Sequence, residues 1–122
     1  MNINMKKNIK VLVADNSEFA KNDLKDFLQN NDKVQFAGVV DNGRDAYRTI
    51  IDEAPDIVLI DVILPVMDGF TVIEKINVNK SIKKKPLFII ISSMGNQSMV
   101  EYACKLGVIY YIMKPYNLDS ML

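Results

Sequence analysis

The 122-residue sequence contains no histidine and only one cysteine. Without histidine, a Ser-His-Asp triad and a histidine-ligated metal site are excluded. Acid-base or metal chemistry therefore has to use carboxylates, lysine, tyrosine or backbone groups. One cysteine cannot form an internal disulfide framework and suits a reducing compartment, so we expect a cytoplasmic location.

Long apolar runs and an excess of either charge are also missing. No apolar run approaches the ~20 residues that span a bilayer, so we expect no membrane-spanning segment. Residues 1–8 are polar and basic and lack the apolar segment of a signal peptide. The 15 basic and 15 acidic residues cancel, which gives no general attraction for nucleic acid or anionic membranes. If the chain regulates a gene, we therefore expect another domain to contact the DNA.

Strand and helix patterns alternate along the whole chain, and 49% of its residues are hydrophobic, enough for one domain with a core. Short apolar runs predict five strands, at residues 10–14, 34–40, 57–60, 87–91 and 108–113. Apolar residues at helical spacing predict four helices between these strands, with Ser17 and Asn96 as N-caps and Gly107 ending the fourth. Residues 41–43 are expected to form a turn. Cys104, on the apolar side of the fourth helix, is expected in the core.

This alternation predicts an α/β fold in which a doubly wound parallel sheet is covered on both faces. In such sheets, ligands bind at the carboxyl ends of the strands. Polar side chains follow or end four of the predicted strands: Asp15 the first, Asp61 the third, Ser92 the fourth and Lys114 the fifth. We therefore expect two carboxylates, one hydroxyl and one ammonium at a single edge of the sheet.

Asp61 is the most informative residue, because it directly follows the apolar run of residues 57–60. Charged side chains are rarely buried unless they are paired or bound to metal. Two carboxylates in one site repel each other, and a divalent cation such as Mg²⁺ relieves that repulsion. An aspartate can act as a nucleophile toward phosphorus, and a nearby lysine and hydroxyl can bind the transferred group's oxygens. The set therefore predicts a phosphorylatable Asp61.

Each of these residues also has a purely structural interpretation. Asp15 could be a helix cap, and Asp61 could be a turn residue. Ser92 could be an ordinary polar strand end. Lys114 and the proline after it could serve merely to end the strand before them. Tyr111 could serve packing alone.

Several short motifs in this order resemble the receiver domains of response regulators, over about residues 10–122. The resemblance implies a flavodoxin-like five-stranded sheet of order 2-1-3-4-5 and one receiver domain over residues 1–122. It also implies a phosphoacceptor switch rather than a turnover enzyme. The motifs are residues 13–16 (VADN), Asp61 with Pro65, Asp68 with Gly69, Ser92 with Ser93, and residues 114–116 (KPY).

In that family, the residue matching Asp61 takes a phosphoryl group from a phosphohistidine of a histidine kinase or a histidine phosphotransfer protein. The resemblance implies that Asp15, Asp61 and the backbone carbonyl of Ile63 hold Mg²⁺. Asn16 stands where the family usually has a second acidic metal ligand. Because an amide oxygen carries no charge, we expect weak Mg²⁺ binding.

The resemblance also assigns roles to three residues on the later strands. Ser92 and Lys114 would contact the phosphoryl oxygens, and Tyr111 would be an aromatic switch whose ring turns inward when Ser92 moves. Two other functions stay open. The first is a phosphorylation-independent interaction module, suggested by Asn16. The second is an enzyme such as an aspartate-nucleophile phosphatase, which would want a second aspartate where Ile63 stands.

The end of the sequence departs from the family, because residues 117–122 allow barely one turn of a fifth helix. We expect that helix to be truncated or absent, with an apolar stripe left bare beside the first and fifth strands. We also expect a longer regulator with a C-terminal DNA-binding output domain, and pairing of two copies through the fourth helix and fifth strand. Residues 37–43 and 110–118 resemble, more narrowly, the receivers of sporulation regulators.

Overall fold

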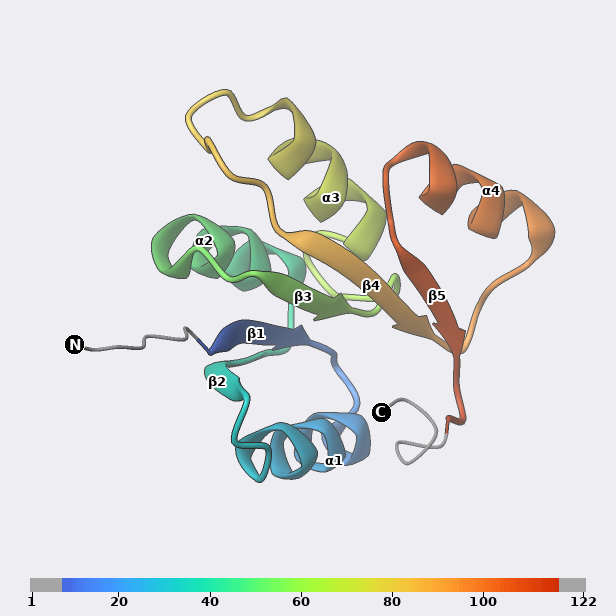
Figure 1. Ribbon diagram of the computed structural model, residues 1–122. Helices are drawn as coiled ribbons and strands as arrows, with labels where there is room; N and C mark the ends of the chain where they lie inside the picture. The colour runs from blue at the N-terminus through green and yellow to red at the C-terminus, as the bar shows by residue number, and fades with distance from the viewer. Residues whose placement is uncertain (1–7, 117–122) are drawn as a thin grey trace.

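The computed structural model describes residues 8–116 and shows five parallel strands in one sheet with four helices (Figure 1). The order β2-β1-β3-β4-β5 along the sheet confirms the flavodoxin-like fold. In chain order, the elements are β1 (Ile9–Ala14), α1 (Glu18–Gln29), β2 (Val34–Val40), α2 (Gly43–Glu53), β3 (Ile57–Ile60), α3 (Gly69–Val78), β4 (Leu87–Ser92), α4 (Gln97–Lys105) and β5 (Tyr110–Met113).

Each of the four helices begins at a side chain that accepts a backbone N–H of its first turn, which satisfies a donor that the helix leaves unpaired. Ser17 and Asn96 cap α1 and α4, as their sequence predicts. Asn42 and Asp68 cap α2 and α3 in the same way. The expectation of a separate turn at residues 41–43 is therefore wrong. Asn42 is already the N-cap of α2, and Gly43 is its first residue.

The core lies on both faces of the sheet, because alternate strand residues point to opposite sides. Leu12 and Ala14 of β1 pack in a cluster with residues of α2, α3 and α4. Val11 and Val13 of the same strand pack in a second cluster with residues of α1. Figure 1 shows this arrangement, with α1 on one side of the sheet and the other three helices on the opposite side.

Two expectations about the fourth helix and fifth strand are wrong. The strand begins at Tyr110 rather than at residue 108, because Val108 N–H closes the end of α4 by donating to Ala103 O at 3.0 Å. Gly107, with φ of 90°, makes this C-terminal motif possible without a steric cost. Cys104 is exposed rather than in the core. On this short helix, Ala103 is the side chain that is fully buried.

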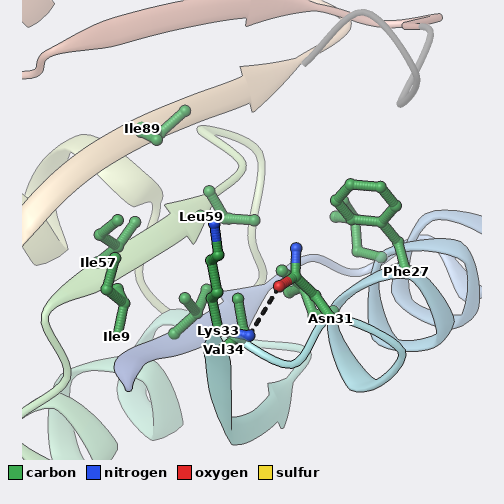
Figure 2. A pocket seen from close by; sticks show the side chains of 11 residues that line it. Ile9, Phe27, Asn31, Lys33, Val34, Ile57, Leu59 and Ile89 are labelled. Carbon is green, nitrogen blue, oxygen red and sulfur yellow. Dashed lines mark hydrogen bonds between the residues drawn. The ribbon is translucent and has the colours of Figure 1, made fainter. Parts of the chain in front are cut away.

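An apolar groove of about 260 Å³ lies on the α1 side of the sheet. Figure 2 shows Ile57, Leu59 and Ile89 on the sheet side of this groove and Phe27 on the helix side. It borders β1 but not β5, so it corresponds only in part to the apolar stripe that the sequence predicts. The expectation of a truncated or absent fifth helix concerns residues 117–122, which lie outside the described residues. Within residues 8–116, no helix is both long and apolar enough to span a membrane.

Candidate functional site

The predicted site residues lie at the carboxyl edge of the sheet. Asp15 directly follows β1 and Asp61 directly follows β3, and these two strands are neighbours. Along the sheet, β2 lies on one side of β1 and β3, β4 and β5 lie on the other. The carboxyl ends of β1 and β3 therefore flank the topological switch point, which is where such sheets bind ligands. Ser92 ends β4, and Lys114 follows β5. The sequence prediction that four strand ends meet at one edge is therefore confirmed by the topology.

Asp15 is a buried carboxylate with two separate contacts. Its side chain is only 3% exposed. Its Oδ1 accepts the backbone N–H of Ser17 at 2.8 Å, immediately before α1. The Lys114 ammonium lies 2.9 Å from its Oδ2 and 3.2 Å from its Oδ1. Ser17, not Asp15, is the N-cap of the helix, so Asp15 supports the helix start and also faces the site.

Asp61 is held at both of its carboxylate oxygens. Oδ1 accepts the backbone N–H of Ile63 at 3.0 Å, and Oδ2 accepts the Lys114 ammonium at 2.8 Å. Its side chain is 7% exposed. The backbone is fixed as well, because Asp61 N–H donates to Ala14 O at 2.9 Å. The plane of this carboxylate is therefore set by a neighbouring strand, its own loop and the lysine that follows β5.

The loop after Asp61 returns tightly to the sheet, which explains the glycine at its end. Gly69 N–H donates to Val62 O at 2.8 Å, and a Cβ at residue 69 would overlap the backbone oxygen of Asp61. The loop also makes a three-residue turn in which Met67 N–H donates to Pro65 O at 2.8 Å. Val66, at the centre of this turn, has φ of 73°. A β-branched residue rarely adopts this conformation, so the loop beside Asp61 is strained.

Lys114 joins the two carboxylates. Its ammonium contacts Asp61 Oδ2 and both oxygens of Asp15, at 2.8 to 3.2 Å. Burial alone would lower the pKa of Lys114, but the hydrogen bonds to Asp61 and Asp15 outweigh burial and raise it. Among residues 8–116, no other lysine or arginine pairs with either carboxylate. Two buried negative charges therefore share one positive charge.

Ser92 is fully buried, and its backbone is beside Lys114, whose N–H donates to Ser92 O at 2.9 Å. Its Oγ accepts the backbone N–H of Met94 at 3.3 Å. The structure therefore places Ser92 on the expected edge of the sheet. A contact between its hydroxyl and a phosphoryl group stays a prediction.

Tyr111 lies on β5 and is half-buried against the loop that follows β4. Its hydroxyl donates a hydrogen bond to the backbone carbonyl of Met94. Burial, together with the negative charge of Asp61, raises the pKa of this hydroxyl above its usual range. Tyr111 is thus both a packing residue and the partner of a loop near the site. Met94, which contacts Ser92 and Tyr111, carries no sequence signal that would have identified it.

We expect Asn16 and Ile63 to provide neutral oxygen ligands. Asn16 directly follows Asp15, Ile63 comes two residues after Asp61, and both residues are exposed. Within the described residues, no cluster of three or more histidine, cysteine or acidic side chains is present. The site thus offers two carboxylates, with neutral oxygens next to them in the chain. Hard oxygen donors of this kind suit Mg²⁺, which binds through one or two carboxylates and keeps several waters.

The sequence matches a family model described as the response regulator receiver domain, over residues 11–122. Solved structures with the same fold include the receiver domain of the NarL response regulator from Mycobacterium tuberculosis. That structure has 23% identity and a TM-score of 0.84, and the alignment covers 93% of this chain and 90% of that one. The response regulator domain of Thermotoga maritima CheB has 26% identity and a TM-score of 0.80, with 91% and 81% covered.

A third similar structure is a DNA-binding response regulator of the LuxR family from Staphylococcus aureus. It has 20% identity and a TM-score of 0.82, with 93% of this chain and 92% of that chain covered. At this level of identity, the similarity shows the shared fold.

Proposed function

Since this chain belongs to the family of response regulator receiver domains, we propose that Asp61 is its phosphoacceptor. The observation that carries the proposal is the ammonium of Lys114, which lies within 2.9 Å of carboxylate oxygens of both Asp15 and Asp61. A cation in this position compensates the charge of a phosphoryl group transferred to Asp61. The donor is a phosphohistidine of a histidine kinase or of a histidine phosphotransfer protein.

In the proposed step, a carboxylate oxygen of Asp61 forms a bond with phosphorus while the P–N bond of phosphohistidine breaks. The electron pair of that bond stays with the imidazole nitrogen, and the product is an aspartyl phosphate. Ile63 N–H holds Oδ1 of Asp61 and so fixes the orientation of the carboxylate. Lys114 moves its hydrogen bond from Asp61 Oδ2 to a phosphoryl oxygen.

Asp15, Asp61 and the Ile63 carbonyl are the residues that would hold Mg²⁺, with Asn16 as a weak fourth donor. When bound, the ion neutralises charge on the phosphoryl oxygens. Asp15 is suited to this role because Ser17 N–H uses Oδ1 and leaves Oδ2 to the Lys114 ammonium at 2.9 Å, beside which the ion would bind. We propose weak binding, because Asn16 brings no charge to the site.

We further propose that phosphorylation changes the conformation around Ser92 and Tyr111. The phosphoryl group adds about −1.5 to −2 units of charge and three acceptor oxygens, on the usual figures for phosphorylated side chains. The Ser92 hydroxyl is a donor that could bind one of these oxygens if it leaves its present position. A movement there reaches Tyr111, because both side chains contact Met94.

The test is incubation of the chain with acetyl phosphate and Mg²⁺, followed by intact-mass measurement. We expect the added mass of one phosphoryl group on the wild type and none on Asp61→Ala. Asp56→Ala is the matched control, because Asp56 lies just before the same strand, at its amino end, and should leave phosphorylation unchanged. Equal phosphorylation of Asp61→Ala and wild type would refute the assignment of Asp61.

Asn16 favours one alternative, a receiver-like interaction module that works without phosphorylation. It predicts that the wild type gains no mass even at high Mg²⁺, whereas Asn16→Asp does. The phosphoacceptor proposal predicts that both proteins are modified and that the wild type needs more Mg²⁺. The Mg²⁺ dependence of the phosphorylation yield in these two proteins therefore separates the alternatives.

For the output, we propose control of transcription through a DNA-binding domain distinct from the receiver. The balanced charge of this chain offers no general attraction for DNA, so the contact has to come from elsewhere. The LuxR-family relative from Staphylococcus aureus, which is DNA-binding, supports an output of this class. More narrowly, we propose that the regulated process is sporulation. We also propose a cytoplasmic location and pairing of two copies of the chain. The proposed chemistry is limited to the receiver's own phosphorylation and dephosphorylation, with no catalytic turnover of another substrate.

A further inference from the structure

The loop between β4 and α4 is joined to both Ser92 and Tyr111 through the backbone of one residue, Met94. Its N–H donates to Ser92 Oγ at 3.3 Å, and its carbonyl accepts the hydroxyl of Tyr111. The two polar groups of Met94 therefore link the end of β4 to a side chain of β5. Neither link depends on the identity of the side chain at residue 94.

Gly95, the next residue, lies directly against two side chains of β5. A Cβ at this position would be 2.8 Å from Cε1 of the Tyr111 ring and would overlap the sulfur of Met113. Tyr111 and Met113 are two residues apart on the strand, so their side chains share one face of the sheet. The thioether of Met113 is flexible and can move away. The ring of Tyr111 is held by its hydroxyl and can move away only by losing the hydrogen bond to Met94.

We propose that Gly95 is a positioning residue that lets the Tyr111 ring follow the movement of Ser92. The inference rests on the proposed function, in which Ser92 Oγ turns toward a phosphoryl group on Asp61. Met94 N–H then either follows Oγ or loses this acceptor. The Met94 carbonyl moves with its own N–H and carries the Tyr111 hydroxyl with it. A side chain at residue 95 would separate the ring from this carbonyl.

The test uses beryllofluoride with Mg²⁺ as a mimic of the phosphoryl group, on the whole chain with ¹³C-labelled tyrosine rings. The Tyr111 signal is assigned by its loss in Tyr111→Phe, since the chain has five tyrosines. In the wild type, we expect the Tyr111 signal to shift when beryllofluoride binds. In Gly95→Ala, we expect the signal to be displaced before addition and its response to fall to less than half.

Two further variants separate the ring contact from its alternatives. Ser98→Ala introduces the same residue at an exposed position in the first turn of α4 and should keep the wild-type response. The double variant Gly95→Ala/Met113→Ala removes the thioether but keeps the ring contact, so its Tyr111 response should stay reduced. A wild-type response in Gly95→Ala, or recovery in the double variant, would overturn the inference.

The ¹⁹F spectrum of bound beryllofluoride distinguishes failure of this inference from failure of the proposed function. If the wild type binds no beryllofluoride, the phosphoacceptor proposal fails, and the inference that rests on it fails too. If beryllofluoride binds but the wild-type Tyr111 signal does not respond, only the inference fails. Should Gly95→Ala not fold, the double variant Gly95→Ala/Tyr111→Ala tests the same contact, because it removes the ring that the added Cβ would meet and should restore folding. Failure of this double variant to fold would overturn the inference, because the ring would then not be what the side chain at residue 95 meets.

Discussion

The two ends of the sheet both carry lysine–carboxylate pairs, yet the pairs are built differently. At the amino end, Asp56 accepts the Lys10 N–H at 2.8 Å and the Lys84 ammonium at 3.2 Å. The Lys10 ammonium in turn lies 3.2 Å from Glu53. These side chains are 24% to 84% exposed, so solvent supplies much of the compensation for their charges.

At the carboxyl end, the carboxylates of Asp15 and Asp61 are 3% and 7% exposed and share the ammonium of Lys114. Solvent cannot compensate charges that are buried to this extent, so one negative charge remains without a partner. The comparison teaches that the number of cations per buried carboxylate, rather than the presence of an ion pair, decides how much negative charge remains uncompensated at each end of the sheet.

The largest expected effect comes from removing the lysine at each end. Lys114→Met leaves two buried carboxylates facing each other, and we expect the free energy of unfolding at pH 7 to fall by about 3 kcal/mol, as for other broken buried ion pairs. Lys84→Met removes an exposed partner of Asp56 and should cost less than about 1 kcal/mol. Urea denaturation followed by circular dichroism, in the absence of Mg²⁺, measures both values.

Equal losses for the two variants would contradict the difference between the ends of the sheet. A second measurement sharpens the same point. Mg²⁺ should stabilise Lys114→Met by more than it stabilises the wild type, because a divalent cation can replace the ammonium between the two carboxylates, and it should stabilise Lys84→Met only as much as the wild type.

The location of the site could be predicted from the sequence because it depends on topology alone. Strands that alternate with helices favour a parallel sheet, in which residues that follow the strands meet at one edge. Asp15, Asp61 and Lys114 could therefore be grouped before any contact was known. The helix caps Ser17 and Asn96 could be predicted for a similar reason, because a cap bonds to a backbone N–H only a few residues away.

Other features could not be predicted, because they depend on contacts between segments far apart in the sequence. The roles of Met94 and Gly95 follow from side chains of β5 that arrive from another part of the chain. The φ of 73° at Val66 comes from the packed loop and opposes the preference of a β-branched residue. Cys104 was wrongly expected in the core because periodicity alone cannot tell how far a short helix is covered.

A smaller effect is expected from adding a charge at the carboxyl end. Asn16→Asp places a third carboxylate next to Asp15 in the chain, and we expect Mg²⁺ to bind about tenfold more tightly, equivalent to about 1.4 kcal/mol. Asn22→Asp is the matched control, because it adds the same charge on an exposed position of α1 and should leave the affinity unchanged. Isothermal titration calorimetry measures both. If the wild type already binds as tightly as Asn16→Asp, the missing charge does not limit the metal site.

The smallest expected effect is a different pH dependence for each end of the sheet. The pKa of Asp56 is lowered from its ordinary 3.8, first by the Lys10 N–H and then by Lys84. Its contribution to stability is thus present above about pH 4 and lost as the pH falls through the lowered value. The pKa of Lys114 is raised from its ordinary 10.5 by the hydrogen bonds to Asp61 and Asp15, which outweigh its burial. Its contribution is present below that pH and lost as the pH rises through the raised value.

Substitution at each end of the sheet should therefore change a different limb of the stability curve. Asp56→Asn should flatten the fall in unfolding free energy below pH 4 and leave the alkaline side unchanged. Lys114→Met should flatten the fall above pH 10.5, where the unfolded chain releases a proton that the folded site retains. Four other groups whose pKa is raised keep part of that alkaline fall in the Lys114 variant: Lys21, Tyr102, Tyr111 and Tyr116. Suppose that Lys114→Met changed the unfolding free energy only at acid pH. The two buried carboxylates would then not be what keeps the Lys114 ammonium protonated at high pH.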